Sequence, residues 1–172
     1  MRRLPIYTAA VSGLMATPAL AADLELSLEI PRLTVAEYHR PYVAVWIETP
    51  DKTAVKTLAV WYDVKLKNQE GQKWLKDMRQ WWRRAGREMT LPADGVSAAT
   101  RAPGKHQVVF KGGAKPLGTL PAGQYNLVVE AAREVGGVEV LRAPFQWPPK
   151  ARASSSAKGT SELGAMTVTV KP

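Results

Sequence analysis

The run Asp94–Thr100 (DGVSAAT) places one carboxylate and two hydroxyl groups among small residues. Asp94 and Gly95 form a dipeptide that is typical of turns. The small residues that precede Thr100 leave its hydroxyl open to approach by another molecule, although a threonine hydroxyl is a weak nucleophile that needs activation from outside. Judged by residue types alone, the run is either an ordinary surface loop or a site at which Thr100 reacts.

A second chemically distinctive stretch is the basic segment from Lys65 to Arg87. It holds eight lysines and arginines against two acids, in a chain whose formal net charge is +9. Charge runs of this kind are commonly solvated helix faces. The alternative is a site for something anionic, such as a phosphate, a nucleotide or an acidic partner. Nucleic acid is a poor candidate, because the chain contains no recognised nucleic-acid-binding motif.

Trp81 and Trp82 lie in the same basic segment. Adjacent residues on a helix point about 100° apart, so the two rings are not expected to be equally buried. One ring then packs in the core, and the other is a candidate stacking surface for a planar ligand. Beside Arg83 and Arg84, an exposed ring would suit a flat, phosphorylated ligand.

Several other chemistries find no support. The chain has no cysteine and only two histidines, His39 and His106. This composition excludes disulfides, thiolate metal sites and a cysteine nucleophile, and it argues against a multi-histidine metal centre. There is no G-x-S-x-G or Walker-type run. The acids are scattered along different predicted strands, so no acid–base pair suggests an enzyme.

The run from Asp94 resembles the flavinylation motif that periplasmic FAD:protein FMN transferases read. That motif is an Asp, two variable residues, Ser or Thr, usually Gly, then Ala and a terminal Thr or Ser. The matching positions are Asp94, Ser97, Ala99 and Thr100. Ala98 stands where Gly is commonest, and modification would slow if the loop needed a glycine-only conformation there. The resemblance implies that Thr100 carries FMN through a phosphoester bond.

A wider resemblance runs from about Pro41 to Trp147. It is carried by PYVAVWIETPDKTAVKTLAVWYD, KWLKDMRQWWR, DGVSAATRAPGKH and GQYNLVVEAAREVGG, which look like a family of small periplasmic proteins of unknown function. That family is often encoded beside PepSY-type membrane proteins and flavin transferases. The partners it implies are an FAD:protein FMN transferase and a membrane-bound PepSY-like flavin or haem reductase, with peripheral membrane contact left open.

The N-terminal segment 1–21 is predicted to be a cleaved export signal. Two arginines near its start are followed by an apolar stretch and by a small-x-small cleavage pattern at Ala19–Ala21. The apolar stretch is too short to span a bilayer. Export without cysteine fits a periplasm, so we expect a periplasmic protein with one mature domain over residues 22–172.

Predicted strands precede and follow both the run Asp94–Thr100 and the basic segment. Leu24–Ile30 alternates apolar and polar residues, as a strand with one buried face does. Further strands are predicted over residues 42–48, 55–67, 106–111, 124–134, 138–147 and 165–170. Residues 88–105 and 148–161 are predicted as loops, the second of them flexible.

The basic segment is predicted to be the one helix, from about Gln72 to Ala85. Its apolar residues recur at helical spacing; they are Trp74, Leu75, Met78, Trp81 and Trp82. With about seven short strands, the pattern predicts a mainly β fold, an immunoglobulin-like β-sandwich with one inserted amphipathic helix.

The leading hypothesis is a periplasmic electron-transfer protein, not itself an enzyme, with FMN attached to Thr100. In this hypothesis Trp81 or Trp82 lies against the flavin ring. Nearby arginines stabilise the phosphate and the anionic reduced flavin and raise its reduction potential; they are Arg83, Arg84, Arg87 and Arg101. The alternative is a non-redox interaction module whose basic helix docks on an anionic partner or surface.

Overall fold

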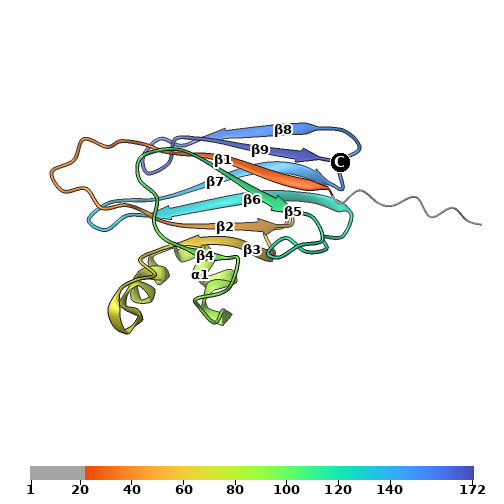
Figure 1. Ribbon diagram of the computed structural model, residues 1–172. Helices are drawn as coiled ribbons and strands as arrows, with labels where there is room; N and C mark the ends of the chain where they lie inside the picture. Colours follow the sequence, from red (N-terminus) through yellow and green to blue (C-terminus); the bar gives the residue numbers. More distant parts are fainter. Residues whose placement is uncertain (1–21) are drawn as a thin grey trace, which may run out of the picture.

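The computed structural model describes residues 22–172, so the predicted export segment 1–21 lies outside the described part. Two β-sheets are packed face to face, and short helices lie against the outer face of one of them (Figure 1). The predicted mainly β fold and the β-sandwich are confirmed. Within residues 22–172, no helix is long and apolar enough to span a membrane.

The first sheet has the strand order β5-β1-β9-β8 and is antiparallel throughout. Its strands are β1 (Asp23–Ile30), β5 (Gly104–Lys111), β8 (Ala153–Lys158) and β9 (Ala165–Lys171). In β1 every second side chain is buried, as the alternating sequence predicted.

The second sheet has the order β4-β3-β2-β6-β7. Its strands are β2 (Tyr42–Glu48), β3 (Ala54–Trp61), β4 (Ser97–Ala98), β6 (Gly123–Ala132) and β7 (Val138–Trp147). All neighbours are antiparallel except β4, which pairs in parallel with the edge of β3.

The second sheet is buried on both faces. Val43, Val45 and Ile47 of β2 face the first sheet and belong to the inner core, whereas Ala44 and Trp46 belong to a second, outer core. Burial on both faces explains why the sequence of β2 is an almost continuous run of apolar residues.

The outer core is covered by three short helical segments: η1 (Lys67–Asp77), α1 (Arg79–Arg84) and η2 (Gly86–Glu88) (Figure 1). The prediction of one continuous helix over 72–85 was therefore wrong. Met78 interrupts it with a non-helical ψ of 74°. The carboxylate of Glu130 accepts hydrogen bonds from the backbone N–H groups of Gln80 and Trp81, at 3.0 and 2.7 Å, and this side chain from β6 fixes where α1 begins.

Two strand predictions also need correction. The strand predicted over 55–67 ends at Trp61, and the chain then turns so closely that Gly71 packs on the carbonyl of Asp63. The loop predicted over 148–161 contains strand β8, so the last strand β9 lies inside the sheet. The sequence did not indicate β8 as a strand, because it is rich in small serines. Two of these serines hydrogen-bond across to threonines of β9.

Candidate functional site

The run Asp94–Thr100 begins with a tight turn. The N–H groups of Val96 and Ser97 donate to the carbonyl of Ala93 at 3.1 and 2.9 Å, and the Ser97 hydroxyl accepts a hydrogen bond from the N–H of Ala93 at 3.0 Å. Gly95 has a φ of +72°, in the left-handed region that favours glycine. The turn explains why a glycine stands at position 95 and a residue with a hydroxyl at position 97.

After the turn the chain joins the edge of the second sheet. The N–H of Val60 donates to the carbonyl of Val96, and that of Tyr62 donates to the carbonyl of Ala98, both at 2.9 Å. Residues 88–105 were predicted as a loop, whereas Ser97 and Ala98 form β4. Ala98 has no positive φ, so an alanine at this position is not strained in the folded protein.

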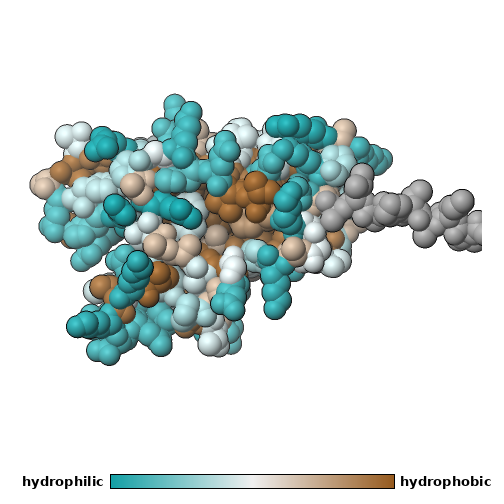
Figure 2. All heavy atoms as spheres, in the orientation of Figure 1, coloured by the Kyte–Doolittle hydropathy of each residue, from teal (hydrophilic) through white to brown (hydrophobic). Residues whose placement is uncertain are grey.

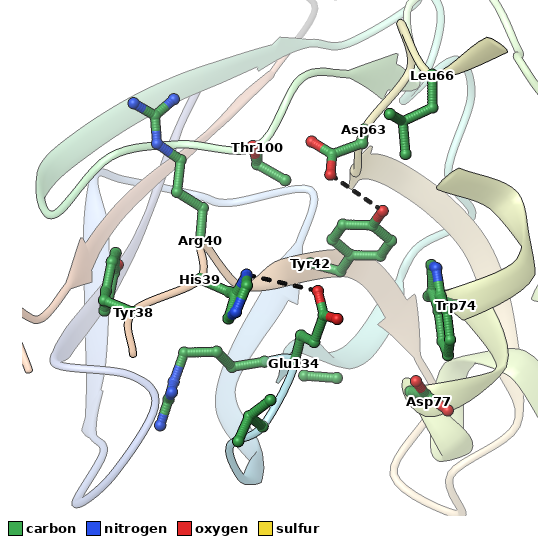
Figure 3. Close-up of a pocket in the computed structure, with 13 residues that line it drawn as sticks. Tyr38, His39, Arg40, Tyr42, Asp63, Leu66, Trp74, Asp77, Thr100 and Glu134 are labelled. Carbon is green, nitrogen blue, oxygen red and sulfur yellow. Dashed lines mark hydrogen bonds and ion pairs between the residues drawn. The ribbon is translucent and has the colours of Figure 1, made fainter. Parts of the chain in front are cut away.

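Thr100 follows β4 and lies on the wall of a cavity of about 540 Å³ (Figure 3). Its side chain is half-buried, and within residues 22–172 its hydroxyl makes no hydrogen bond. The rest of the wall comes from residues 38–42, the turn after β3, η1, and the turn between β6 and β7. A cavity of this size is typical of sites for small ligands or cofactors.

Tyr42 and Asp63 form the polar centre of the wall. The hydroxyl of Tyr42 donates to Asp63 Oδ2 at 3.4 Å. Burial, together with the negative charge of Asp63, raises the pKa of Tyr42 to about 12. The phenol therefore stays protonated at any physiological pH.

The remaining charges on the wall are mixed. His39 lies between two acids, with Nε2 at 2.8 Å from Glu37 and Nδ1 at 3.5 Å from Glu134 (Figure 3). Arg133 is buried and paired with Glu162, Nε to Oε2 at 2.8 Å, which fixes the turn between β6 and β7. Arg40 lines the cavity, and within the described residues it forms no ion pair.

The two tryptophans predicted beside the flavin do not line this cavity. Trp81 is fully buried, and its indole N–H donates to the Thr57 hydroxyl at 3.1 Å. Trp82 is half-buried and tilted against Trp81, with ring centroids 6.1 Å apart. The expectation that the two rings differ in burial is confirmed, with Trp81 as the core residue.

The predicted arginines also lie away from the cavity wall. Arg84 Nη1 pairs with buried Glu48 at 2.7 Å, and Arg83 Nε donates to the carbonyl of Arg79 at 3.2 Å. The guanidinium of Arg101 lies over the ring of Trp61, 5.2 Å from its centroid. The strongly basic flavin environment expected from the sequence is not what surrounds Thr100.

Apart from Thr100, none of the residues on the wall was a candidate in the sequence analysis, and Trp74 and Arg40 show why. Trp74 was assigned to the buried face of the predicted helix, yet its side chain is 51% exposed, because that helix breaks at Met78. Arg40 lies in a connection with no strand or helix pattern. An exposed tryptophan is uncommon, but its exposure could not be read from spacing alone.

In the part of the chain that the structure describes, no group of three or more His, Asp or Glu side chains could hold a metal ion. The site consists of the Thr100 hydroxyl, which makes no hydrogen bond within residues 22–172, of the rings of Tyr38, Tyr42 and Trp74, and of several charged side chains.

Comparison with known proteins identifies a family that covers most of the chain. The family model described as "Predicted periplasmic protein (DUF2271)" matches residues 23–165. The chain belongs to this family. No curated protein and no solved structure matches it.

The DUF2271 match covers strands β1 to β8, all three helical segments and the whole of the Asp94–Thr100 run, and it ends at the first residue of β9. The family's description as periplasmic agrees with the export predicted from the N-terminal segment. The description assigns no activity, so a function for this DUF2271 protein has to be argued from the site.

Proposed function

We propose that this protein is a periplasmic electron-transfer protein that carries FMN, joined through a phosphoester to Thr100. The observation that supports this most strongly is the place of Thr100. Thr100 is half-buried on the wall of a cavity of about 540 Å³, two residues after β4 and the turn that Gly95 and Ser97 shape, and within residues 22–172 its hydroxyl has no hydrogen-bond partner.

The residues around Thr100 fit the parts of FMN. The cavity has room for a three-ring system, and Tyr42 and Trp74 offer flat, largely apolar surfaces to it. Arg40 offers a positive charge for the phosphate. When bound, FMN supplies the electron chemistry, and the protein holds it, limits its contact with water and keeps it from diffusing away.

The attachment step balances without an oxidant or reductant. Thr100 Oγ1 forms a bond to the FMN phosphorus of FAD, the pyrophosphate bond breaks, and AMP leaves. The hydroxyl proton passes to a base of the transferase, because no group of this chain hydrogen-bonds that hydroxyl within residues 22–172. The transferase, the membrane-bound PepSY-like reductase that donates electrons, and the extracytosolic acceptor are partners in this proposal.

Intact mass tests the proposal directly. The full chain is co-expressed with an active periplasmic FAD:protein FMN transferase, and the exported protein is weighed. We expect a gain of one FMN less one water and a yellow protein. Thr100→Ala should abolish both, whereas Thr100→Ser keeps the hydroxyl and should be modified.

Thr90→Ala is the matched control, because Thr90 is an exposed threonine outside the motif. It should be modified as fully as the wild type. An unmodified wild-type mass, while the same transferase modifies another substrate in the same cells, would refute the flavin proposal.

One observation favours the second candidate, a basic docking module. Seven of the eight basic side chains between Lys65 and Arg87 are exposed, and Arg84 is the exception. Binding to phosphatidylglycerol vesicles that is lost at high salt, by a protein that never acquires flavin, would support this candidate.

A further inference from the structure

The cavity wall has two chemically different sides, with Thr100 between them. In Figure 3, Arg40 lies on one side of Thr100, and Tyr42 and then Trp74 lie on the other. The first side offers a guanidinium and the ring of Tyr38, whereas the second offers the rings of Tyr42 and Trp74. FMN has the same division, since a charged phosphate is at one end and a planar ring system at the other.

We propose that FMN on Thr100 has one orientation in this cavity, with its ring system against Trp74 and its phosphate beside Arg40. The inference rests on the proposed function. It assigns Trp74 as the residue that covers the ring, in place of the tryptophans that the sequence suggested, and it assigns Arg40 as the residue that pairs with the phosphate.

Burial and contacts favour Trp74 over the other two tryptophans of the helical segments. Half of the Trp74 side chain is exposed at the cavity, and no hydrogen bond holds its indole within residues 22–172. Trp81 is enclosed in the outer core, and Trp82 packs against that core. An exposed indole gains from being covered by another flat ring, because contact removes apolar area of both from water.

Charge favours Arg40 as the phosphate partner. Arg84 is committed to Glu48. Arg133 pairs with Glu162 through Nε and Nη2, and its remaining Nη1 is buried and has no hydrogen-bond partner within residues 22–172. Arg40 has no acidic partner in the described residues and lines the same cavity as Thr100. It also lines an adjoining cavity together with Arg32, so the positive charge continues on that side. A planar guanidinium matches two phosphate oxygens well.

The acidic side chains oppose the reverse orientation. Asp63, held by Tyr42, lies on the same side of Thr100 as the aromatic pair, and Asp77 lies beside Trp74 (Figure 3). A phosphate on that side would meet two carboxylates of like charge. The uncharged oxidised ring system meets no such repulsion.

Flavin fluorescence tests the assignment of Trp74. Wild type, Trp74→Leu and Trp82→Leu are each modified by the transferase, and intact mass gives the FMN content, which tests the proposed function separately. An indole in contact with a flavin quenches its emission, so emission per bound FMN should rise several-fold in Trp74→Leu. Trp82→Leu should match the wild type.

Fluorescence anisotropy tests the assignment of Arg40. Arg40→Gln should lower the anisotropy of the bound flavin, because the phosphate end is less restrained, whereas Arg83→Gln should not. A fully modified Trp74→Leu protein with wild-type emission would overturn the ring assignment. A fully modified Arg40→Gln protein with wild-type anisotropy would overturn the phosphate assignment. A wild-type protein that acquires no FMN would instead refute the proposed function, on which both assignments rest.

Discussion

Gly95 and Ser97 fix the chain just before Thr100 by different means. Gly95 supplies a left-handed backbone, and Ser97 supplies the hydroxyl that satisfies the N–H of Ala93. Both features involve only the motif and Ala93, the residue just before it, so they belong to the local conformation of the turn. Thr100, the proposed attachment residue, follows this turn and β4.

Replacing Gly95 should therefore destabilise the protein through its backbone. A β-carbon added at this position has ordinary contact with Pro116, so there is no clash to explain a loss. The left-handed conformation alone should lower the free energy of unfolding of Gly95→Ala by about 1–2 kcal/mol, measured by urea denaturation. Gly95→Asn tolerates this conformation better and should lose less. Equal stability of the alanine variant and the wild type would contradict this explanation.

The phenol of Tyr42 makes stability depend on alkaline pH. Its pKa is raised from 10.0 to about 12 by burial and by Asp63, so between these values the unfolded chain releases a proton that the folded chain retains. This contribution to stability is complete below pH 10 and is lost as the pH rises towards 12.

Tyr42→Phe should remove the part of the stability loss at alkaline pH that the ionisation of Tyr42 causes. Unfolding free energies of both proteins measured from pH 9 to 11.5 should converge as the pH rises. Asp63→Asn keeps the phenol but removes the charge, so it should show a smaller effect in the same direction. Parallel curves for the wild type and Tyr42→Phe would mean that Tyr42 ionises at an ordinary pH.

At the scale of elements, α1 is attached to the second sheet by buried carboxylates. Glu130 of β6 binds the first N–H groups of the helix, and Glu48 of β2 binds Arg84 at 2.7 Å and Arg142 at 2.7 Å. The helix has only six residues, too few to be stable alone, so its position depends on these contacts and on Trp81.

Glu48→Gln should cost about 3 kcal/mol of stability, since it leaves the two arginines without their shared buried acid. Chemical denaturation measures this loss. Lys111 pairs with Asp23 at the surface, and breaking that exposed pair with Lys111→Gln is the control, expected to cost less than about 1 kcal/mol. Similar losses in both variants would show that Glu48 does not hold α1 in place.

The same element shows what the sequence could predict and what it could not. Alternation in Leu24–Ile30 depends only on neighbours along the chain, and the predicted strand is confirmed. The start of α1 after Met78 depends on Glu130, which is fifty residues from Gln80, the residue whose N–H it binds, and no local pattern predicts it. For the same reason Thr100 was found from a short motif, whereas Trp74 and Arg40 became visible only when the fold brought distant segments together.

Considered as a whole, the molecule has two apolar cores that share one sheet. Alternate residues of β2 face each core, so loss of either core exposes one face of the same strand. Figure 2 shows that hydrophilic side chains cover most of one face of the molecule, with a hydrophobic patch near its middle. The shared sheet argues against independent unfolding of the helical cover.

We expect one cooperative unfolding transition. Tryptophan fluorescence reports on both cores, since Trp46 and Trp81 lie in the outer core and Trp61 and Trp147 in the inner one. Far-UV circular dichroism reports on the strands, and the denaturation midpoints of the two signals should coincide. Leu75→Ala truncates the outer core, and it should shift both midpoints together with a loss of about 2–5 kcal/mol. A fluorescence transition that precedes the loss of strand signal would show that the two cores unfold separately.

If Thr100 receives FMN as proposed, the shortness of β4 bears on when that step takes place. This strand has two residues, and backbone hydrogen bonds to Val60 and Tyr62 hold it at the sheet edge. A transferase that must take the run Asp94–Thr100 into its own active site meets little resistance if β4 has not yet docked, or if it detaches locally. We therefore expect maturation to follow an order, in which the newly exported chain receives FMN first and the edge of the sheet then closes beside it.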